Sequence, residues 1–207
     1  MNDPTNVTEL DLVVGSLITT RPDEDRESFE EERDIIAEVQ DQLREEGLDV
    51  DLLSQPGVEV WEGGIETIGA LYQLSRIAVH LERDGEIDAV LADGPNLAED
   101  LDPFVTDVWD DQFATRFPHL IKLQGINSYY LPIDFSDPIW MPFETDEDDE
   151  EEAFFGSSVR LQRELTELAA MMKSARVPTN NTAYRCFETL RDAAEQSVTN
   201  GLPIIVW

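Results

Sequence analysis

Three side chains near the middle of the chain have the chemistry needed for proton transfer: His119, Tyr130 and Asp134. Tyr130 and Asp134 are predicted to lie on one face of an extended segment, because side chains alternate along a strand. If His119 lies across a β-hairpin from them, the three groups form a polar cluster able to perform hydrolase-like acid–base catalysis. The alternative is that they belong to one sheet face that is half exposed to water.

The second candidate is a polar stripe on a helix predicted over residues 66–83. At about 100° per residue, Arg76, His80 and Arg83 fall on one side together with Gln73. Most of the remaining circumference is apolar, so the helix is expected to be mostly buried. The stripe would suit an anion or a partner's carboxylate, unless its arginines simply pair with acids of this chain.

Trp61, Gly63 and Gly64 precede that helix and form a third candidate. The glycines would let a ligand approach the backbone, Trp61 would stack on it, and a helix N-terminus attracts anions. This pattern predicts a small-ligand site, with a tight turn beside a core tryptophan as the alternative. Trp140, in the proline-bracketed segment 138–142, is either an anchor for a protein partner or a clasp over the core.

Other chemical sites are not indicated by the sequence. The chain has two histidines and one cysteine, Cys186, which excludes an internal disulfide and a multi-cysteine metal site. We expect Cys186 to be a buried structural thiol. The sequence contains no glycine-rich phosphate loop, nucleophile elbow, zinc-protease motif or calcium-loop spacing. We therefore expect no metal and no cofactor.

The charge of the chain is extreme, with 46 Asp and Glu against 14 Lys and Arg and a formal net charge of −32. Such a surface repels phosphate backbones and anionic lipids, so neither nucleic acid nor membrane is an expected partner. No apolar run approaches the roughly 20 residues of a membrane-spanning helix. Residues 1–4 show no secretory signal.

Acid is spread along the whole chain, while only Lys122 and Lys173 are lysines. In composition alone, the chain resembles cytoplasmic proteins of halophiles that accumulate salt, and this resemblance implies a cytoplasmic location. The competing interpretation is a nucleic-acid mimic, or a decoy for a basic partner. A mimic would concentrate its acid on one face, whereas the predicted helices carry acid on whichever face is polar.

The order of predicted elements indicates a single α/β domain over residues 1–207. Strands and helices alternate in the first 120 residues, which favours a mixed, partly parallel central sheet flanked by helices. A hairpin over 119–135 would add an antiparallel component, and residues 144–156 are expected to form a flexible acidic loop. The other predicted strands cover 8–20, 48–53, 58–61, 87–92 and 202–207. The other helices are predicted to begin near Ser28 (a capping box with Glu31), Asp102, Ser157 and Asn181.

The absence of catalytic motifs makes a non-enzymatic interaction or regulatory protein, of the immunity or accessory type, the first hypothesis for function. An enzyme using His119, Tyr130 and Asp134 is one alternative. A small-ligand binder at Trp61–Gly64 is the other. The sequence leaves the partner and the oligomeric state open.

Overall fold

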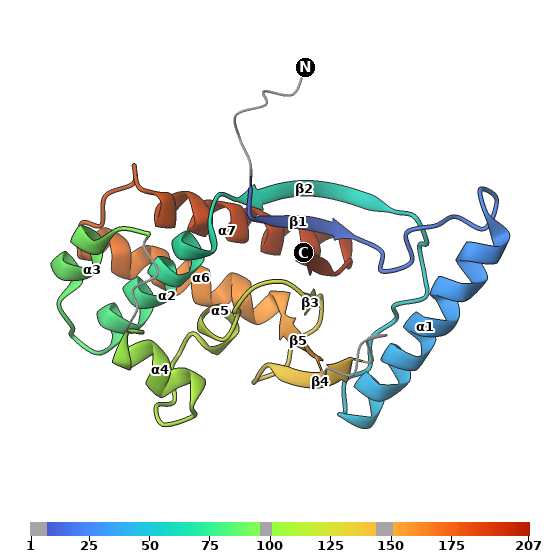
Figure 1. Ribbon diagram of the computed structural model, residues 1–207, viewed down its shortest axis with the longest axis horizontal. Helices are drawn as coiled ribbons and strands as arrows, with labels where there is room; N and C mark the ends of the chain where they lie inside the picture. Colours follow the sequence, from blue (N-terminus) through green and yellow to red (C-terminus); the bar gives the residue numbers. More distant parts are fainter. Residues whose placement is uncertain (1–7, 96–100, 144–150) are drawn as a thin grey trace, which may run out of the picture.

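The computed structural model describes residues 8–95, 101–143 and 151–207 (Figure 1). Within these ranges the strands are β1 (Leu10–Gly15), β2 (Glu59–Ile65), β3 (Ser128–Leu131), β4 (Ile139–Phe143), β5 (Glu151–Ser157) and β6 (Ile204–Val206). The helices are α1 (Arg26–Glu45), α2 (Ile68–Glu82), α3 (Ile87–Asp93), α4 (Pro103–Trp109), α5 (Pro118–Ile121), α6 (Ser158–Ser174) and α7 (Thr182–Asn200).

The described strands form one mixed sheet, in the order β2-β1-β6-β3-β5-β4. β3 and β5 run parallel, and every other neighbouring pair is antiparallel. The predicted α/β class with a partly parallel sheet is therefore confirmed. β6 lies inside the sheet between β1 and β3, and its three residues are buried, which explains why the chain is apolar almost to its last residue.

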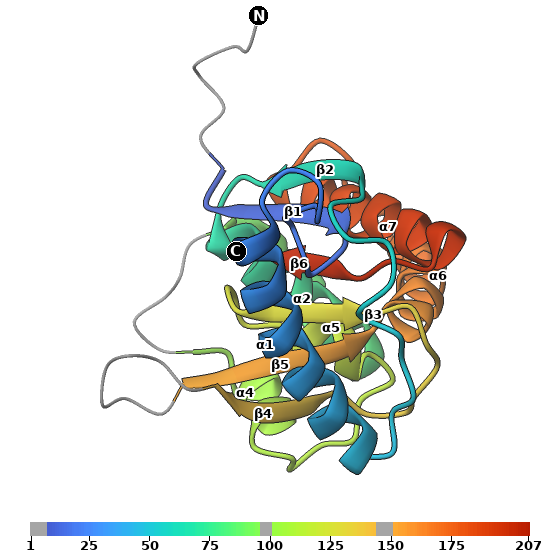
Figure 2. The same cartoon turned by 90° about the vertical axis from the view of Figure 1, so that its right-hand side faces the viewer.

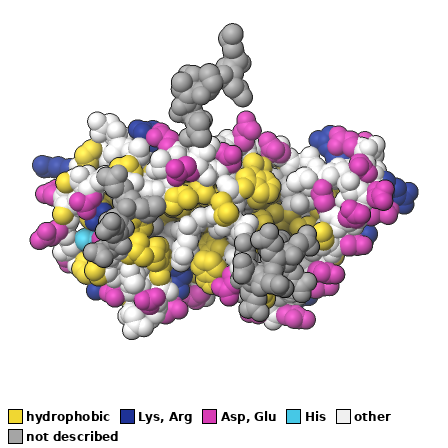
Figure 3. All heavy atoms as spheres, in the orientation of Figure 1, with side chains coloured by type: hydrophobic (Ala, Val, Ile, Leu, Met, Phe, Trp, Pro, Cys, Tyr) yellow, Lys and Arg dark blue, Asp and Glu magenta, His cyan; other side chains and the backbone are white. Residues whose placement is uncertain are grey.

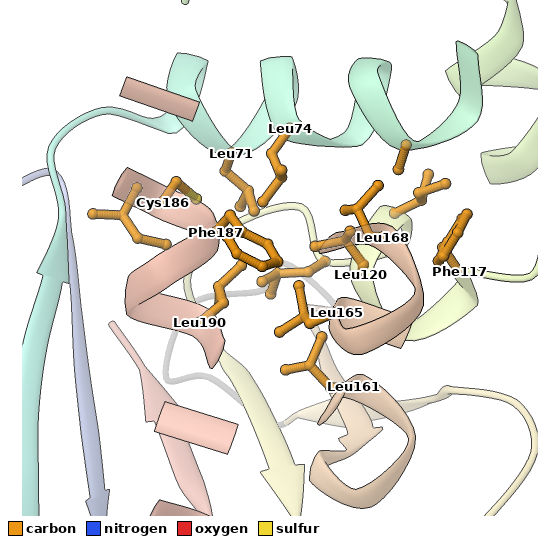
Figure 4. Close-up of a cluster of buried hydrophobic side chains, with 14 of the residues drawn as sticks. Leu71, Leu74, Phe117, Leu120, Leu161, Leu165, Leu168, Cys186, Phe187 and Leu190 are labelled. Carbon is orange, nitrogen blue, oxygen red and sulfur yellow. The ribbon is translucent and has the colours of Figure 1, made fainter. Parts of the chain in front are cut away.

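Helices α2, α6 and α7 cover one face of the sheet and enclose the larger core. Figure 4 shows leucines of α2, α5, α6 and α7 converging on Phe187. Ile204 and Val206 point into this core, while Ile205 between them belongs to the opposite face and lines a groove under α1. The face on which each β6 residue lies thus follows from strand alternation.

Helix α1 lies across the opposite face of the sheet (Figure 2). Ile36, Val39 and Leu43 face a smaller apolar cluster with residues of β3, β4 and β5. Polar contacts fix the helix as well. The Glu32 carboxylate accepts hydrogen bonds from the Thr19 and Thr20 backbone N–H groups at 2.6 and 3.0 Å. These contacts anchor α1 along its length, so its outer face has a defined orientation.

Several predicted elements differ in the structure. Residues 87–92 form helix α3 rather than a strand, because a short apolar run suits either element and only Val90 of this helix is fully buried. Residues 48–53 form no strand. Helix α1 is capped by Asp25, three residues before the predicted cap at Ser28, and Asp25 accepts from the N–H groups of residues 27 and 28.

The expected hairpin over 119–135 is also wrong. Pro118 occupies the first turn of α5, so residues 118–121 are helical, and β3 ends at Leu131. The antiparallel hairpin-like pairs are instead β1 with β2 and β4 with β5. In the predicted acidic loop, residues 151–156 belong to β5, and residues 144–150 lie outside the described residues.

Candidate functional site

The structure buries two of the three predicted acid–base residues. His119 and Tyr130 are each 0% exposed, and the Tyr130 hydroxyl donates to the His119 carbonyl at 2.7 Å. The His119 Nδ1 accepts from the Ser157 N–H at 3.0 Å, so Nε2 carries the proton and donates to the Ser136 carbonyl at 3.2 Å. Burial lowers the pKa of His119 to about 4, which leaves the ring neutral at pH 7.

Asp134 is exposed and forms ion pairs with arginines instead of joining the buried pair of His119 and Tyr130. Its two carboxylate oxygens accept from Arg160 and Arg163 of α6. The side-chain partner that the sequence did not predict is Glu164, whose carboxylate accepts from the His119 and Leu120 N–H groups at 3.1 and 2.9 Å. The available signal was an acid on the inward face of a leucine-rich helix. Burial raises the pKa of Glu164 to about 8.

The polar stripe of α2 faces acids of the segment that follows it. Asp102 Oδ2 lies 2.9 Å from Arg76 Nε and 2.9 Å from His80 Nε2. Arg83 Nη1 lies 2.7 Å from Asp107 Oδ2. The polar groups of this stripe therefore tie α2 to α4 and to the cap of α4.

Trp61, Gly63 and Gly64 lie inside strand β2, before the helix that begins at Ile68. A Cβ added at Gly63 would stand 2.4 Å from the Trp61 ring, so this glycine makes room for the tryptophan. Trp140 of β4 is 39% exposed and packs edge-on against Phe154.

Cys186 is buried in α7, and burial raises the pKa of its thiol. Among the described residues, no group of three or more His, Cys, Asp or Glu side chains could hold a metal ion. No described helix is long and apolar enough to cross a membrane. The polar groups named so far therefore serve mainly to connect parts of this chain.

The outer face of α1 carries a continuous row of acids. With about 100° per residue, every residue of α1 that falls within one sector of about 100° is Asp or Glu, and all of them are exposed. We call this row the α1 acidic stripe: Glu27, Glu30, Glu31, Asp34, Glu38, Asp41 and Glu45. In Figure 3 the acidic side chains crowd the right-hand end of the molecule, where Figure 1 places α1.

Most carboxylates of the α1 acidic stripe lack an internal counterion. Glu30 pairs with Arg26 and Asp41 with Arg44, both along the flank of the helix. In the part of the chain that the structure describes, no side chain pairs with the carboxylates of the remaining members: Glu27, Glu31, Asp34, Glu38 and Glu45.

Outside α1, most of the described Lys and Arg side chains form ion pairs with acidic side chains of this chain. Glu66 before α2 binds Arg185 of α7, and Glu82 of α2 binds Arg116. Further described ion pairs involve Arg76, Arg83, Lys122, Arg160, Arg163 and Arg191. Helix α1 carries three arginines of its own, but only Arg26 and Arg44 form ion pairs with the stripe, so five of its seven carboxylates have no ion-pair partner among the described residues.

The geometry describes an acidic α/β protein that presents a straight, well-anchored row of carboxylates and whose buried histidine has no exposed ring atoms. Over residues 8–206 the chain matches the model of a family described as "Putative DNA-mimic protein". Because the match spans nearly the whole sequence, the chain belongs to this family. No curated protein and no solved structure matched the chain.

Family membership corrects the function expected from the sequence. The match overturns the immunity-type or accessory module, the enzyme at His119, Tyr130 and Asp134 and the ligand binder at Trp61–Gly64, whereas the expected protein partner agrees with the description of the family. The error has a physical origin. Acid that is spread along a sequence does not by itself distinguish solvent adaptation from mimicry, whereas the α1 acidic stripe gathers seven carboxylates on one exposed helix face.

Proposed function

We propose that this protein acts as a DNA mimic, whose α1 acidic stripe occupies the DNA-binding surface of a basic protein and keeps duplex DNA away from it. The observation that carries the proposal is the uninterrupted carboxylate sector of α1, together with the family to which the chain belongs. The partner is a protein that binds DNA through arginines and lysines, and no reaction is catalysed.

The spacing of the stripe supports this proposal. From Glu27 to Glu45 the helix rises about 27 Å at 1.5 Å per residue, so the stripe carries roughly one carboxylate per 4.5 Å. One strand of B-DNA carries a phosphate every 3.4 Å or so along the axis. The charge density of the stripe thus approaches that of a single DNA strand. Arginine binds carboxylate and phosphate through the same two-pronged hydrogen-bonding geometry.

Rigidity also favours recognition, since ordering a flexible segment on binding costs affinity. Helix α1 is capped by Asp25 and tied to the 19–20 segment by Glu32. Gln40 Oε1 accepts from the Leu52 N–H at 2.8 Å, which ties the second half of α1 to the following segment. The stripe therefore presents its charge without folding first, as a DNA duplex does.

We further propose that the protein lies in the cytoplasm, where a partner that binds DNA would meet it. This placement follows from the partner class and depends on the DNA-mimic proposal.

The test is a competition between this protein and duplex DNA. Proteins eluted from a duplex-DNA resin serve as probes, and the wild-type chain, immobilised, should retain some of them until excess duplex DNA displaces them. The stripe variant Glu31→Gln, Asp34→Asn, Glu38→Gln removes three carboxylates without changing side-chain size. Exposed charge pairs contribute about 0.2–1 kcal/mol each, so affinity should fall roughly 3- to 150-fold.

The matched control removes three exposed acids from α7: Glu188→Gln, Asp192→Asn and Glu195→Gln. Both variants have the same net charge, so a general electrostatic effect would weaken them equally. Retained binding by the α7 variant with loss by the stripe variant supports the proposal. Equal behaviour of the two variants, or partners that duplex DNA does not displace, would refute it.

A further inference from the structure

An apolar groove of about 170 Å³ lies between α1 and the sheet, beside the α1 acidic stripe. Ile35, Ile36 and Val39 of α1 form one wall. Residues of four strands, β3 to β6, and the terminal Trp207 form the floor and the other wall: Tyr129, Met141, Ala153, Phe155, Ile205 and Trp207. Ile35 and Trp207 are 56% and 52% exposed, so large apolar side chains stand at the rim in contact with water.

The groove and the stripe belong to one surface. On the α1 helical wheel, Gln42 and Ile35 follow the stripe by about 20° and 40° beyond Glu31, and both line the groove. A molecule lying along the stripe therefore meets the groove without crossing another element. In Figure 3 a hydrophobic area is visible next to the acidic end of the molecule.

We propose that this groove receives an apolar side chain that the partner otherwise inserts between DNA base pairs. The partner is then a DNA-bending protein with a wedge of Phe, Leu, Ile, Met or Pro beside its phosphate-binding cations. The inference rests on the proposed DNA mimicry and specifies its partner class. The stripe replaces the phosphate row, and the groove replaces the opened base step.

Size and charge both favour this occupant. An apolar protein cavity of about 150 Å³ accepts a benzene ring, so the groove has room for one aromatic or branched side chain. A second copy of this chain would bring another surface with the same large negative charge toward the stripe and be repelled. A basic surface is attracted there, and only a protruding apolar side chain on that surface can fill the groove.

The experiment compares two purified probes in direct binding measurements with the full-length chain. The first is an HMG-box domain, which inserts an apolar wedge, together with its wedge-to-alanine variant. The second is the basic region of a leucine-zipper protein, which binds DNA without a wedge. Burying one wedge side chain corresponds to roughly 10- to 100-fold in affinity, so the HMG box should bind more tightly than its alanine variant by that factor.

Two changes in the groove test the assignment to this site. Ala153→Leu fills the floor, and Ile35→Ser removes an apolar rim residue at an exposed position where folding is not at risk. Each should reduce the preference for the intact wedge while leaving binding of the basic region within about twofold, given that the stripe is unchanged. Circular dichroism confirms that both variants are folded.

The outcomes separate the two proposals. Tight binding of both probes with no preference for the intact wedge overturns the wedge inference and leaves the DNA mimicry standing. Loss of the preference in either folded groove variant supports the inference. If the stripe variant binds both probes as the wild type does, the proposed function itself fails. If the groove changes instead alter the sedimentation mass of the chain alone, the occupant is a second copy and the wedge inference is overturned.

Discussion

The α1 acidic stripe should make the protein less stable than it would be without it, and this cost can be measured. In the variant Glu31→Gln, Asp34→Asn, Glu38→Gln, three carboxylates become amides of the same shape. Their removal eliminates like-charge pairs three or four residues apart along α1: 27–31, 30–34, 31–34, 34–38 and 38–41. Each such pair destabilises a helix by about 0.2–0.5 kcal/mol.

Five pairs give a total of about 1–2.5 kcal/mol in favour of the variant at low ionic strength. Glu and Gln have similar helix propensities, as do Asp and Asn, so intrinsic propensity contributes little to the difference. For a domain of this size, the gain corresponds to an increase of roughly 2–10 °C in Tm. Because the stripe is exposed, the difference should shrink near 1 M KCl, where the Debye length is about 3 Å.

The assay is urea unfolding followed by circular dichroism at about 0.01 M and about 1 M ionic strength. In the α7 control variant the acids share their face with Arg185 and Arg191, so attractive and repulsive pairs offset and stability should change little. A stripe variant that is less stable than the wild type, or a gain that persists unchanged at high salt, would contradict the assignment of unbalanced repulsion to α1. Greater stability combined with weaker partner binding would show that the acid row is maintained for recognition.

Three further predictions follow from the buried parts of the structure. Because the pKa of Glu164 is raised from 4.5 to about 8, its contribution to the free energy of unfolding is complete below about pH 4.5 and is lost as pH rises toward 8. Glu164→Gln should therefore flatten the pH dependence of stability between these values, as measured by urea unfolding. Leu43→Ala, at a fully buried position under α1, should cost about 2–5 kcal/mol by the same assay and also weaken partner binding in the competition assay. Deleting residues 204–207 removes an interior strand of the sheet and should abolish cooperative thermal unfolding in calorimetry.

The class of fold was predictable because its signals are local. Ser157 and Asn181 cap α6 and α7 as the sequence indicates, and Gly201 ends α7 in a left-handed conformation. The continuously apolar β6 and the mostly apolar α2 likewise indicated their own burial. The order of strands was not predictable, since β6 pairs with β1 and β3, which are distant in sequence and give no local signal of the pairing.

The elements that were predicted wrongly are short. Residues 119–123 contain too few positions for periodicity to separate strand from helix. Besides Pro118 in the first turn, the distant Glu164 side chain supports the helix by accepting from two N–H groups at the start of α5. The same contact explains why His119 was a misleading candidate. A lone histidine in a short apolar segment reads equally as a catalytic group or as a core residue, and only the position of its ring nitrogens distinguishes the two.

The candidate surface illustrates a different limit. The sequence alone contains the α1 acidic stripe, and a helical wheel over 26–45 would have found it. The sequence does not show which acids elsewhere in the molecule are neutralised by arginines in the folded chain. Arg185 neutralises Glu66, although the two residues are 119 positions apart in the sequence. Arg116 neutralises Glu82, which lies 34 positions before it.

The net charge of −32 does not depend on which acids the cations pair with. A binding partner, however, responds to the local field within about one Debye length, roughly 8 Å at physiological ionic strength. At that range the outer face of α1 presents seven carboxylates, of which only Glu30 and Asp41 have an ion-pair partner among the described residues. The fold therefore places part of the acid content of the chain in one ordered row on α1, and the position of these carboxylates is what a DNA-binding surface would recognise.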